Sequence, residues 1–446
     1  MTNPILSSLE VALLHELAPA PLWVGYSGGL DSTVLLHWLT TQYPVDRITA
    51  VHINHQLHPA ANDWQAHAQQ FCQHLGVNWQ CQTVQVSTDA GQSLEEAARI
   101  ARYEAFASQV PPGGHLLLAH HRQDQLETML LQLLRGSGVQ GLAAMPTIRC
   151  WRQRSVHRLM LTVSRADILH YAQTHQLHWI EDATNHDLTF ARNQLRHQLI
   201  PMMQRYWPGA EQTITRSAHL CGEAAELLQD LAALDYAGCQ HFNRHQLLIT
   251  PLRRLSPARQ RNVLRYWIAQ LGYRAPNYDK LIALQTDLLL ARLDANPIVR
   301  WGTVEVRRYR DILFVHPLLS PIDTSEYWQW DLTQPLKLPG TLGQLTAIQV
   351  AADQPLGTDL PMGETQVTVR LRQGGESCYL PGRAGRRSLK KLFQTWGIPP
   401  WQRDRLPLIF YQDQLIGIPG WLSGQLPIKP QTVTRWQWVW TCELSS

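Results

Sequence analysis

Short apolar runs alternate with amphipathic stretches along the first 136 residues. Four such pairs follow one another: PLWVGY (21–26) before STVLLHWLTT (32–41), ITAVHI (48–53) before NDWQAHAQQFCQHLG (62–76), WQCQTVQV (79–86) before SLEEAARIARYEAFASQV (93–110), and HLLLAH (115–120) before RQDQLETMLLQLLRG (122–136). In the amphipathic stretches, apolar side chains recur every three or four residues, as a helix requires. Four β-then-α units in a row predict an α/β fold with a doubly wound parallel sheet, covered by helices on both faces.

The pattern continues and then changes in the next hundred residues. We expect another strand-and-helix unit in RLMLTVSRADILHYAQTHQ (158–176), followed by the basic segment FARNQLRHQLIPMMQRYWPG (190–209). Trp207-Pro208-Gly209 is typical of a boundary. We therefore expect a first domain over residues 1–208.

The remainder of the chain is expected to form two smaller domains. Long helical patterns and a strand-like tail, TVEVRRYRDILFVHP, predict a mostly helical middle domain over 209–320. Weak periodicity with proline-rich turns over 321–365 indicates a linker or irregular strand. Residues 366–446 then predict a small α+β domain.

Composition narrows the class of protein without naming a ligand. The chain has 446 residues, 44% of them hydrophobic, with a formal net charge of +4 and a pI near 8.7. Seven scattered cysteines without a CxxC pair argue against a disulfide framework or a structural zinc. No basic residue precedes Arg47, and no apolar run approaches the ~18 residues of a membrane span. We expect a soluble cytoplasmic protein without a membrane partner.

The stretch VGYSGGLDSTVLLHW (24–38) places a polar, glycine-rich turn between the first expected strand and its helix. Such a turn directs backbone N–H groups and the positive helix end to one point outside the sheet, where doubly wound sheets bind phosphates. The glycines allow close approach, and the serines can donate from their hydroxyls. Asp31 can cap the helix or hold a Mg²⁺ that bridges phosphates. The alternative is an ordinary turn with an Asp31-Ser32 cap, but the place of the turn in the sheet favours a phosphate site.

The kind of phosphate loop follows from residues that are present and absent. A Walker A loop needs a lysine, and the first lysine of this chain is Lys280. The turn after the first expected strand does not carry the dinucleotide fingerprint GxGxxG either. SGGLDS resembles the SGGxDS loop of the PP-loop, or N-type, ATP pyrophosphatases, which activate a carbonyl oxygen as its adenylate. The resemblance implies ATP and Mg²⁺ as cofactors, with ATP bound by Ser27, Gly28, Gly29, Leu30, Asp31 and Ser32.

Within this group the chain resembles the tRNA(Ile)-lysidine synthetase family. The matching blocks are VHINHQL (51–57), EEAARIARYEAF (95–106), LAHHRQDQLET (118–128), LLRGSGVQGLAAM (133–145), EDATNHDLTFARNQLRHQLIP (181–201) and the segment 369–410. His58 departs from the family, which usually has arginine there, and leaves any contact of that guanidinium open.

The resemblance implies ATP-dependent ligation of free L-lysine to C2 of the wobble cytidine, position 34, of tRNA(Ile) with a CAU anticodon. ATP adenylates the C2 oxygen with release of pyrophosphate, and the lysine ε-amine then displaces AMP to give lysidine. An alternative in the same group is a PP-loop tRNA thiolase that acts on an anticodon-loop pyrimidine. An alternative of another class is a non-catalytic tRNA-binding protein. The sequence leaves the oligomeric state open, a homodimer included.

Two carboxylates are candidates for the chemistry. Asp124 and Glu127 are three residues apart near the start of the helix after HLLLAHH, so they share one face of that helix. They can ligate Mg²⁺, hold the lysine ammonium, or, with one pKa raised by the other, accept its proton. The alternative is an ordinary pair of acids that complements the helix dipole. We assign both, with Asp31, to the catalytic set.

Four arginines accompany these acids. Arg99 and Arg102 share a helix face and suit phosphate contacts or salt bridges to neighbouring glutamates. For Arg192 and Arg196 the family resemblance favours contacts to tRNA or substrate phosphates. We count Arg192 as catalytic and the other three as tRNA-binding. The histidines at 52, 55, 58, 120 and 121 fit no zinc motif, so we interpret them as polar caps and assign no metal site to them.

The last domain carries most of the excess charge. Residues 366–405 hold nine basic side chains against two acids, a net +7, with aromatic residues between them. This pattern predicts an RNA surface, for which we select Arg383, Arg386, Arg387, Lys390 and Lys391. A solvated basic face with core aromatics is the alternative, and it accounts better for Phe393 and Trp396.

Overall fold

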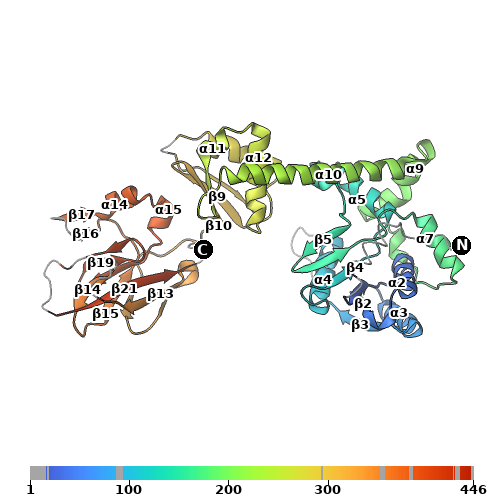
Figure 1. The fold of residues 1–446 in the computed structure, drawn as a ribbon, viewed down its shortest axis with the longest axis horizontal. Coiled ribbons are helices and arrows are strands. Elements are labelled where there is room, and N and C mark those ends of the chain that lie inside the picture. The colour runs from blue at the N-terminus through green and yellow to red at the C-terminus, as the bar shows by residue number, and fades with distance from the viewer. Residues whose placement is uncertain are drawn as a thin grey trace. The chain divides into compact units, whose positions relative to one another are not determined.

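The computed structural model describes residues 17, 20–86, 94–292, 295–351, 357–380, 385–424, 426 and 432–442. The chain divides into two compact units, Met1–Leu228 and Gln229–Ser446. The division falls within one long helix, α10 (Ala210–Ala237), which is the longest ribbon in Figure 1. The domain boundaries expected near residues 208 and 320 stay predictions.

The first unit is built on a sheet that has six strands within the described residues, in the order β3-β2-β1-β4-β6-β5. The strands are β1 (Leu22–Gly25), β2 (Ile48–Asn54), β3 (Asn78–Thr83), β4 (His115–Leu117), β5 (Ile148–Trp151) and β6 (Arg154–His157). Neighbouring strands are parallel except for the edge strand β5, which is antiparallel to β6. The predicted doubly wound parallel sheet is therefore confirmed.

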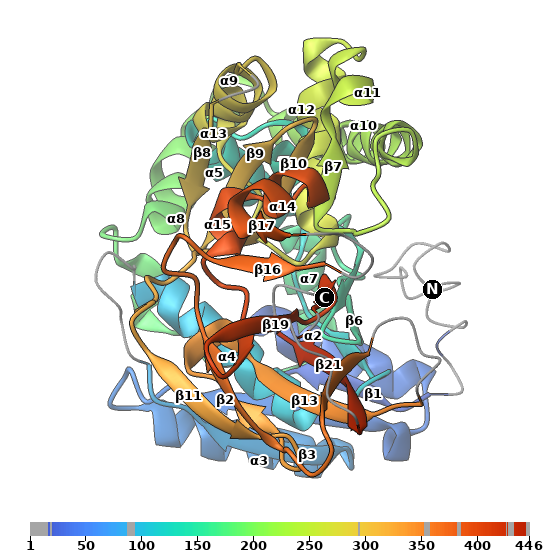
Figure 2. The same ribbon diagram turned by 90° about the vertical axis from the view of Figure 1, so that its left-hand side faces the viewer.

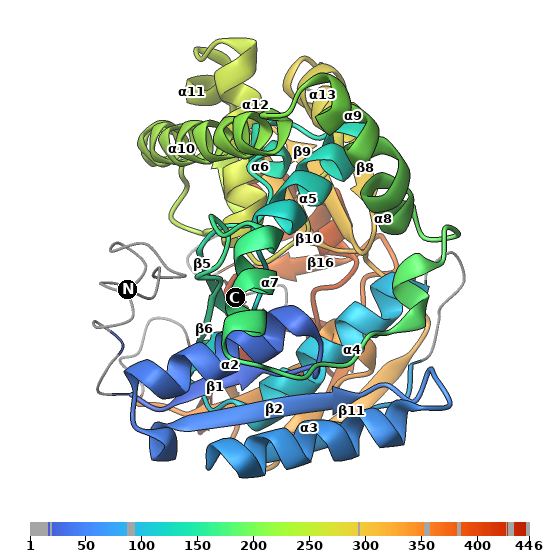
Figure 3. The same ribbon diagram turned by 90° about the vertical axis from the view of Figure 1, so that its right-hand side faces the viewer.

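Helices cover both faces of this sheet, as Figure 3 shows for α2, α3 and α4. The helices of this unit within the described residues are α2 (Leu30–Gln42), α3 (Ala61–Leu75), α4 (Leu94–Gln109), α5 (Arg122–Leu134), α6 (Val139–Leu142), α7 (Arg165–Thr174), α8 (Ala191–Gln194) and α9 (Ile200–Tyr206), with a π-helical turn (Leu195–Leu199) between the last two and 3₁₀ turns at Val45–Arg47 and Ala183–His186. Alternate residues of a strand face opposite sides. Leu22 and Val24 pack with α2, α3 and α7, whereas Trp23 packs with Phe106 of α4.

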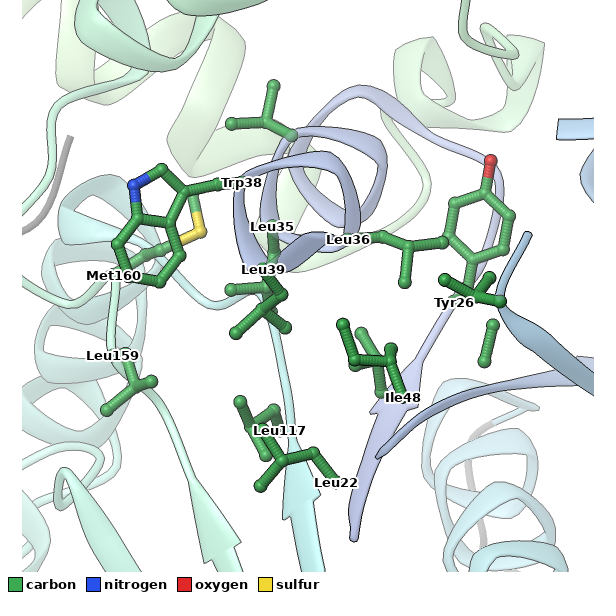
Figure 4. Packing of buried hydrophobic residues seen from close by; sticks show 14 of the residues in the cluster. Leu22, Tyr26, Leu35, Leu36, Trp38, Leu39, Ile48, Leu117, Leu159 and Met160 are labelled. Carbon is green, nitrogen blue, oxygen red and sulfur yellow. The ribbon is translucent and has the colours of Figure 1, made fainter. Parts of the chain in front are cut away.

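The larger core of this unit lies between the sheet and α2. Figure 4 shows Leu35, Leu36 and Leu39 of α2 beside Leu22, Ile48 and Leu117 of the strands. Each of these side chains is almost completely buried. Burial on this scale stabilises the fold by about 1.5–3 kcal/mol per large apolar side chain.

The last strand-and-helix unit differs in detail from the expectation. The helix of RLMLTVSRADILHYAQTHQ is α7, but the strand, β6, ends at His157, before this stretch begins. Leu159, Met160 and Leu161 are buried after the strand has ended. β5 and β6 form a hairpin whose turn residues, Arg152 and Gln153, have positive φ angles of 46° and 61°. Neither residue is a usual turn former, so the hairpin left no signal in the sequence.

The second unit begins with helices and a four-stranded antiparallel sheet, counted over its described residues, in the order β7-β10-β9-β8. Its elements are β7 (Gln246–Leu248), α11 (Ile249–Arg253), α12 (Pro257–Gln270), α13 (Tyr278–Ala283), a π-helical turn (Leu284–Leu289), β8 (Ile298–Trp301), β9 (Val304–Tyr309) and β10 (Ile312–Pro317). The expected strand-like tail is the β9–β10 hairpin.

The rest of the second unit holds two further sheets, with β16 and β17 beside α14 in Figure 2. Their elements are β11 (Tyr327–Asp331), β12 (Leu336–Lys337), a 3₁₀ turn (Gly340–Leu342), β13 (Gln344–Gln349), β14 (Thr358–Pro361), β15 (Gln366–Arg370), β16 (Ser377–Tyr379), β17 (Arg386–Ser388), α14 (Leu389–Trp396), α15 (Pro400–Arg403), β18 (Leu408–Tyr411), β19 (Gln414–Ile418), β20 (Leu422–Ser423) and β21 (Val433–Thr441). The α+β prediction is confirmed.

The segment 321–365 is not a linker. β11 pairs with β15, and β13 and β14 pair with the two sides of β21. Trp330, Leu345 and Leu360 of this segment lie in the same buried cluster as Trp436 and Trp438. Of the two alternatives expected here, a linker or irregular strand, the strand is the one found; short strands of mixed burial carry little periodicity, so the pattern could not separate the two.

None of the helices in the part of the chain that the structure describes is both long enough and apolar enough to span a membrane.

Candidate active site

The glycine-rich turn lies at the carboxyl end of β1, and helix α2 begins directly after it. Gly29 is the N-cap of α2 and no side chain caps the helix, so the expected alternative of an Asp31-Ser32 cap is not found. The amides of the first helical turn have no intrahelical acceptor. They face the same sheet edge as the loop, which gives an anion site its donors and its positive helix end.

Gly28 is the residue of the loop that only glycine suits. Its φ angle is +84°, in the region that side chains disfavour. A Cβ there would lie 2.8 Å from Cδ1 of Ile180. The amide of Ile180 also donates to the Gly28 carbonyl at 2.9 Å. The loop is thus held from outside by the segment that follows α7.

The serines of the loop hold its shape. The Ser27 and Ser32 hydroxyls are 3.0 Å apart, and the Ser27 amide donates to the Ser32 hydroxyl at 3.2 Å. The Gly29 amide donates to the Ser27 hydroxyl over a long 3.3 Å. Hydrogen bonds as long as the last one are weak, so a phosphate oxygen can replace them. The Gly29 amide nevertheless already has an acceptor, the Ser27 hydroxyl.

Asp31 is the loop residue best placed to meet a cation. Burial raises the pKa of Asp31, and the nearby carboxylate of Asp124 raises it further against the opposing effect of His121. Its Oδ1 atom is buried and has no hydrogen-bond partner among the described residues. A carboxylate oxygen in that situation is costly unless a positive group reaches it.

His121 joins Asp31 to helix α5. The His121 side chain is 1% exposed, and its Nε2 atom lies 3.7 Å from Oδ2 of Asp31 and 3.7 Å from Oδ2 of Asp124. It is the N-cap of α5, and the helix begins with a reciprocal capping box in which the His121 amide donates to Asp124 at 2.9 Å. The interpretation of His121 as a polar cap is confirmed.

Glu127 is completely buried and is held by two arginines. Arg192 Nε donates to one carboxylate oxygen at 2.6 Å, and Arg196 Nε donates to the other at 2.7 Å. Arg192 also donates to Asp124 at 2.9 Å. Although burial lowers the pKa of Arg192, the two carboxylates raise it overall.

The ionisation of Asp124 follows from these neighbours. Burial alone would raise the pKa of Asp124, but His121 and Arg192 lower it well below its usual range. Asp124 is therefore a carboxylate at neutral pH. The expected alternative in which one acid of the pair has a raised pKa and accepts a proton does not describe Asp124.

Further arginines and a histidine lie near the two acids. Burial lowers the pKa of His120 to about 3, and the neighbouring Arg158 and Arg102 lower it further against the opposing effect of Asp124. Burial also lowers the pKa of Arg102, which feels the charges of Arg99 and Arg192. The guanidinium groups of Arg102 and Arg158 lie near Arg192, which pairs with Asp124 and Glu127, and such groups bind phosphates readily.

The sequence analysis selected residues of this site, but several of their contacts differ from those expected. Arg99 lies over the ring of Tyr103 at 5.1 Å, and Glu104, one of its expected salt-bridge partners, pairs instead with Arg152 at 2.5 Å. His58, where the family usually has arginine, stacks on Trp64 with ring centroids 4.7 Å apart. The bridge through His121 and the Ile180 contact to the loop were missed, because tertiary contacts of this kind leave no spacing pattern.

The expected RNA surface of the last domain is exposed in part. Arg386 and Arg387 on β17 and Lys390 and Lys391 on α14 are all exposed, and we call these four residues the basic patch. Arg383 lies outside the described residues. Phe393 is buried in the core and Trp396 packs against it, as the core interpretation predicted.

Other basic residues of the region serve the fold. Arg405 is almost buried and donates to the Ser320 carbonyl. Arg403 donates to the Tyr309 hydroxyl at 3.1 Å, and Arg372 pairs with Asp404 at 3.0 Å.

Comparisons with known proteins give matches over most of the length of this chain. Three family models match: "PP-loop domain" over residues 7–203, "TilS substrate binding domain" over 247–314 and "TilS substrate C-terminal domain" over 367–440. The tRNA(Ile)-lysidine synthase of Coxiella burnetii is 43% identical over 89% of this chain and 88% of the relative. That of Legionella pneumophila strain Paris is 37% identical over 98% of this chain and 99% of the relative.

Among solved structures, the U34-tRNA thiolase NcsA from Methanococcus maripaludis matches with a TM-score of 0.38 and 14% identity, over 46% of this chain and 72% of that chain. A likeness at this level carries no information about activity.

Changing Gly28 to alanine tests the loop geometry. We expect Gly28→Ala to lose about 1–2 kcal/mol of unfolding free energy because of its positive φ angle, and to lose most of its affinity for ATP because the amides of the loop must move. The measurements are urea denaturation and calorimetric titration with ATP.

Gly113→Ala is the matched control. Gly113 has a φ angle of +79°, and a Cβ there meets nothing within 4 Å. It should lose similar stability and keep its ATP affinity. Equal ATP affinity in the two variants would show that the shape of the loop at Gly28 does not matter for nucleotide binding.

Proposed function

The chain belongs to the tRNA(Ile)-lysidine synthase family, and on that premise we propose that it ligates free L-lysine to C2 of the wobble cytidine of tRNA(Ile) with a CAU anticodon. ATP is consumed to AMP and pyrophosphate through an adenylated cytidine. The observation that carries the proposal is the sheet edge at which the SGGLDS loop, the carboxylates of Asp31 and Asp124 and several arginines meet.

The loop supplies what the first step needs. Amides of the Gly28–Ser32 turn and the helix end hold the pyrophosphate that leaves, while the Ser27 and Ser32 hydroxyls donate to its oxygens. Arg102 and Arg192 lie near the same edge and offset the charge that develops as the cytidine oxygen attacks the α-phosphate.

Mg²⁺ fits this edge through Asp31. The Oδ1 atom of Asp31 is buried without a partner in the described part of the chain, and a single carboxylate together with substrate phosphates is a usual Mg²⁺ site. Asp124 is a weaker candidate because Arg192 and the His121 amide already occupy its oxygens. When bound, Mg²⁺ neutralises phosphate charge.

The lysine needs a carboxylate for its ammonium groups. Asp124 remains ionised at neutral pH and can attract an ammonium, but a carboxylate with so low a pKa is a poor general base. Glu127 is shielded by Arg192 and Arg196, so we assign it the role of orienting these arginines. Arg192 bonds to Asp124, which is proposed for lysine, and lies near Arg102, which is proposed for the phosphates, so it connects the two groups.

Each unit carries candidate residues for contacts with tRNA. We propose that Arg99, Arg102 and Arg196 contact it near the reacting base, and that the basic patch, with Arg383, binds its backbone through the last domain. We further propose that the protein works in the cytoplasm. The cysteines of the described residues form no disulfide, which suits a reducing compartment.

The reaction itself is tested with radiolabelled lysine. Incubation with ATP and a tRNA(Ile) transcript should place the label in lysidine at the wobble position, with AMP and pyrophosphate formed in equal amount. A methionine tRNA transcript with the same anticodon serves as the control and should stay unlabelled. Incorporation from a sulfur donor would indicate the thiolase, and tRNA binding without pyrophosphate release would indicate a non-catalytic protein.

Changing the loop should stop the chemistry and spare tRNA binding. We expect Asp31→Ala and Ser27→Ala to reduce tRNA-dependent pyrophosphate release by about 100-fold or more, because they remove groups aimed at the phosphates. Asp63→Ala removes an exposed acid from the first turn of α3 and should behave as wild type. A matching loss of tRNA affinity in the loop variants would instead assign them a structural role.

Neutralising the basic patch should weaken tRNA binding in a salt-dependent way. We expect the variant with glutamine at positions 386, 387, 390 and 391 to lower the slope of log affinity against log salt by ~0.7–0.9 for each phosphate that the protein no longer neutralises. Lys337→Gln, an exposed lysine on β12, is the control. Filter binding at several salt concentrations measures the slope, and an unchanged slope would remove the patch from the RNA footprint.

A further inference from the structure

His121 occupies a position that its role as a helix cap does not require. A cap needs one acceptor for the amides of the first turn. His121 provides this acceptor with Nδ1, which receives the Gln123 amide at 3.2 Å. The other ring nitrogen, Nε2, lies 3.7 Å from each of two carboxylates that belong to different elements, Asp31 in the first turn of α2 and Asp124 of α5.

The cap determines which nitrogen of the ring carries the proton. Because Nδ1 accepts a hydrogen bond from a main-chain amide, the neutral ring has its proton on Nε2. That N–H is directed at the space between the two acids. The main chain of His121 is also fixed, since it pairs with Met160 and the next amide, that of Arg122, donates to the Val163 carbonyl at 3.0 Å. A rotation of the ring would break the hydrogen bond between Nδ1 and the Gln123 amide.

The two carboxylates differ in what else holds them. Asp124 has the His121 amide and Arg192, at 2.9 Å each. The Oδ2 atom of Asp31 faces His121, while its Oδ1 atom is buried without a partner among the described residues. The Nε2 atom of His121 thus makes an electrostatic contact with Oδ2 of Asp31 that is longer than a hydrogen bond, and Oδ1 remains available.

We propose that His121 is a positioning residue for the metal–nucleotide complex: its Nε2–H attracts Oδ2 of Asp31 electrostatically across 3.7 Å, so that Oδ1 is presented to the cation that accompanies ATP. The proposal rests on the proposed function. It concerns the direction of the Asp31 carboxylate and requires no change in the protonation of His121.

The cap and the bridge can be separated by substitution. Asparagine is among the best N-cap residues, but its short side chain cannot extend to Asp31 while it caps the helix. His121→Asn should therefore keep the melting temperature near that of wild type. His121→Ala loses both roles, and Asn277→Ala, which removes the cap of α13 in the second unit, loses a cap alone.

The readout is binding, so it does not depend on turnover. Calorimetry with the non-hydrolysable analogue α,β-methylene-ATP, in Mg²⁺ and in EDTA, gives the part of the affinity that the metal contributes. Electron paramagnetic resonance of Mn²⁺ gives metal affinity directly. For His121→Asn we expect about a three- to tenfold loss of analogue affinity in Mg²⁺, because a 3.7 Å contact is weaker than a full hydrogen bond to a charged group, and little change in EDTA. Asn277→Ala should show neither change.

The outcomes distinguish the two proposals. If His121→Asn binds the analogue and Mn²⁺ as wild type does, His121 is only a cap and the inference is overturned. The same holds if its affinity falls equally with and without metal, since the loss would then concern the loop and not the cation. If the wild-type protein itself fails to bind the analogue, the proposed function is contradicted, and the role of His121, which rests on it, is contradicted as well.

Discussion

A carboxylate that is completely buried has to be neutralised where it lies, and the first unit meets this requirement at Glu127. Both of its oxygens are taken by guanidinium groups of Arg192 and Arg196. Breaking a buried pair of this kind costs about 3–5 kcal/mol, so α5 and the segment that carries the arginines are fixed to one another. Arg192 also donates to Asp124, and the His121 ring lies between Asp124 and Asp31, 3.7 Å from an oxygen of each. One electrostatic chain therefore connects the interior with the sheet edge.

The turn that carries these arginines is unusual. Arg192 lies in α8, and the backbone continues as a π-helical turn from Leu195 to Leu199 that contains Arg196. Wide turns of this kind occur mostly as single turns within α-helices and often at functional sites. Asn193, between the two arginines, is buried and donates to the carbonyls of Thr184 and Asp187 at 2.9 and 2.8 Å. The segment is thus held from both of its sides.

The sequence was informative where local pattern decides the structure. The spacing of Val24 in β1 and of the leucines in α2 follows directly from the two periods of strand and helix, so the parallel sheet could be predicted. The contacts of Arg192 with Glu127 could not, because 65 residues separate them and nothing local marks the pairing. The basic residues of the last domain show the same limit. The count of basic residues over 366–405 includes both Arg405, which is nearly buried, and Lys390, which is exposed. The count alone cannot separate them, because burial is decided by tertiary packing.

The hydrogen bond from the Ile180 amide to the Gly28 carbonyl means that the nucleotide loop of this fold depends on a residue far from it in the sequence. Residues 24–38, transplanted alone onto another sheet, would leave the Gly28 carbonyl without its donor and the glycine without the neighbour against which its bare Cα packs. The loop and the stretch that begins at Ile180 have to be inherited together, although most of the first unit lies between them along the chain.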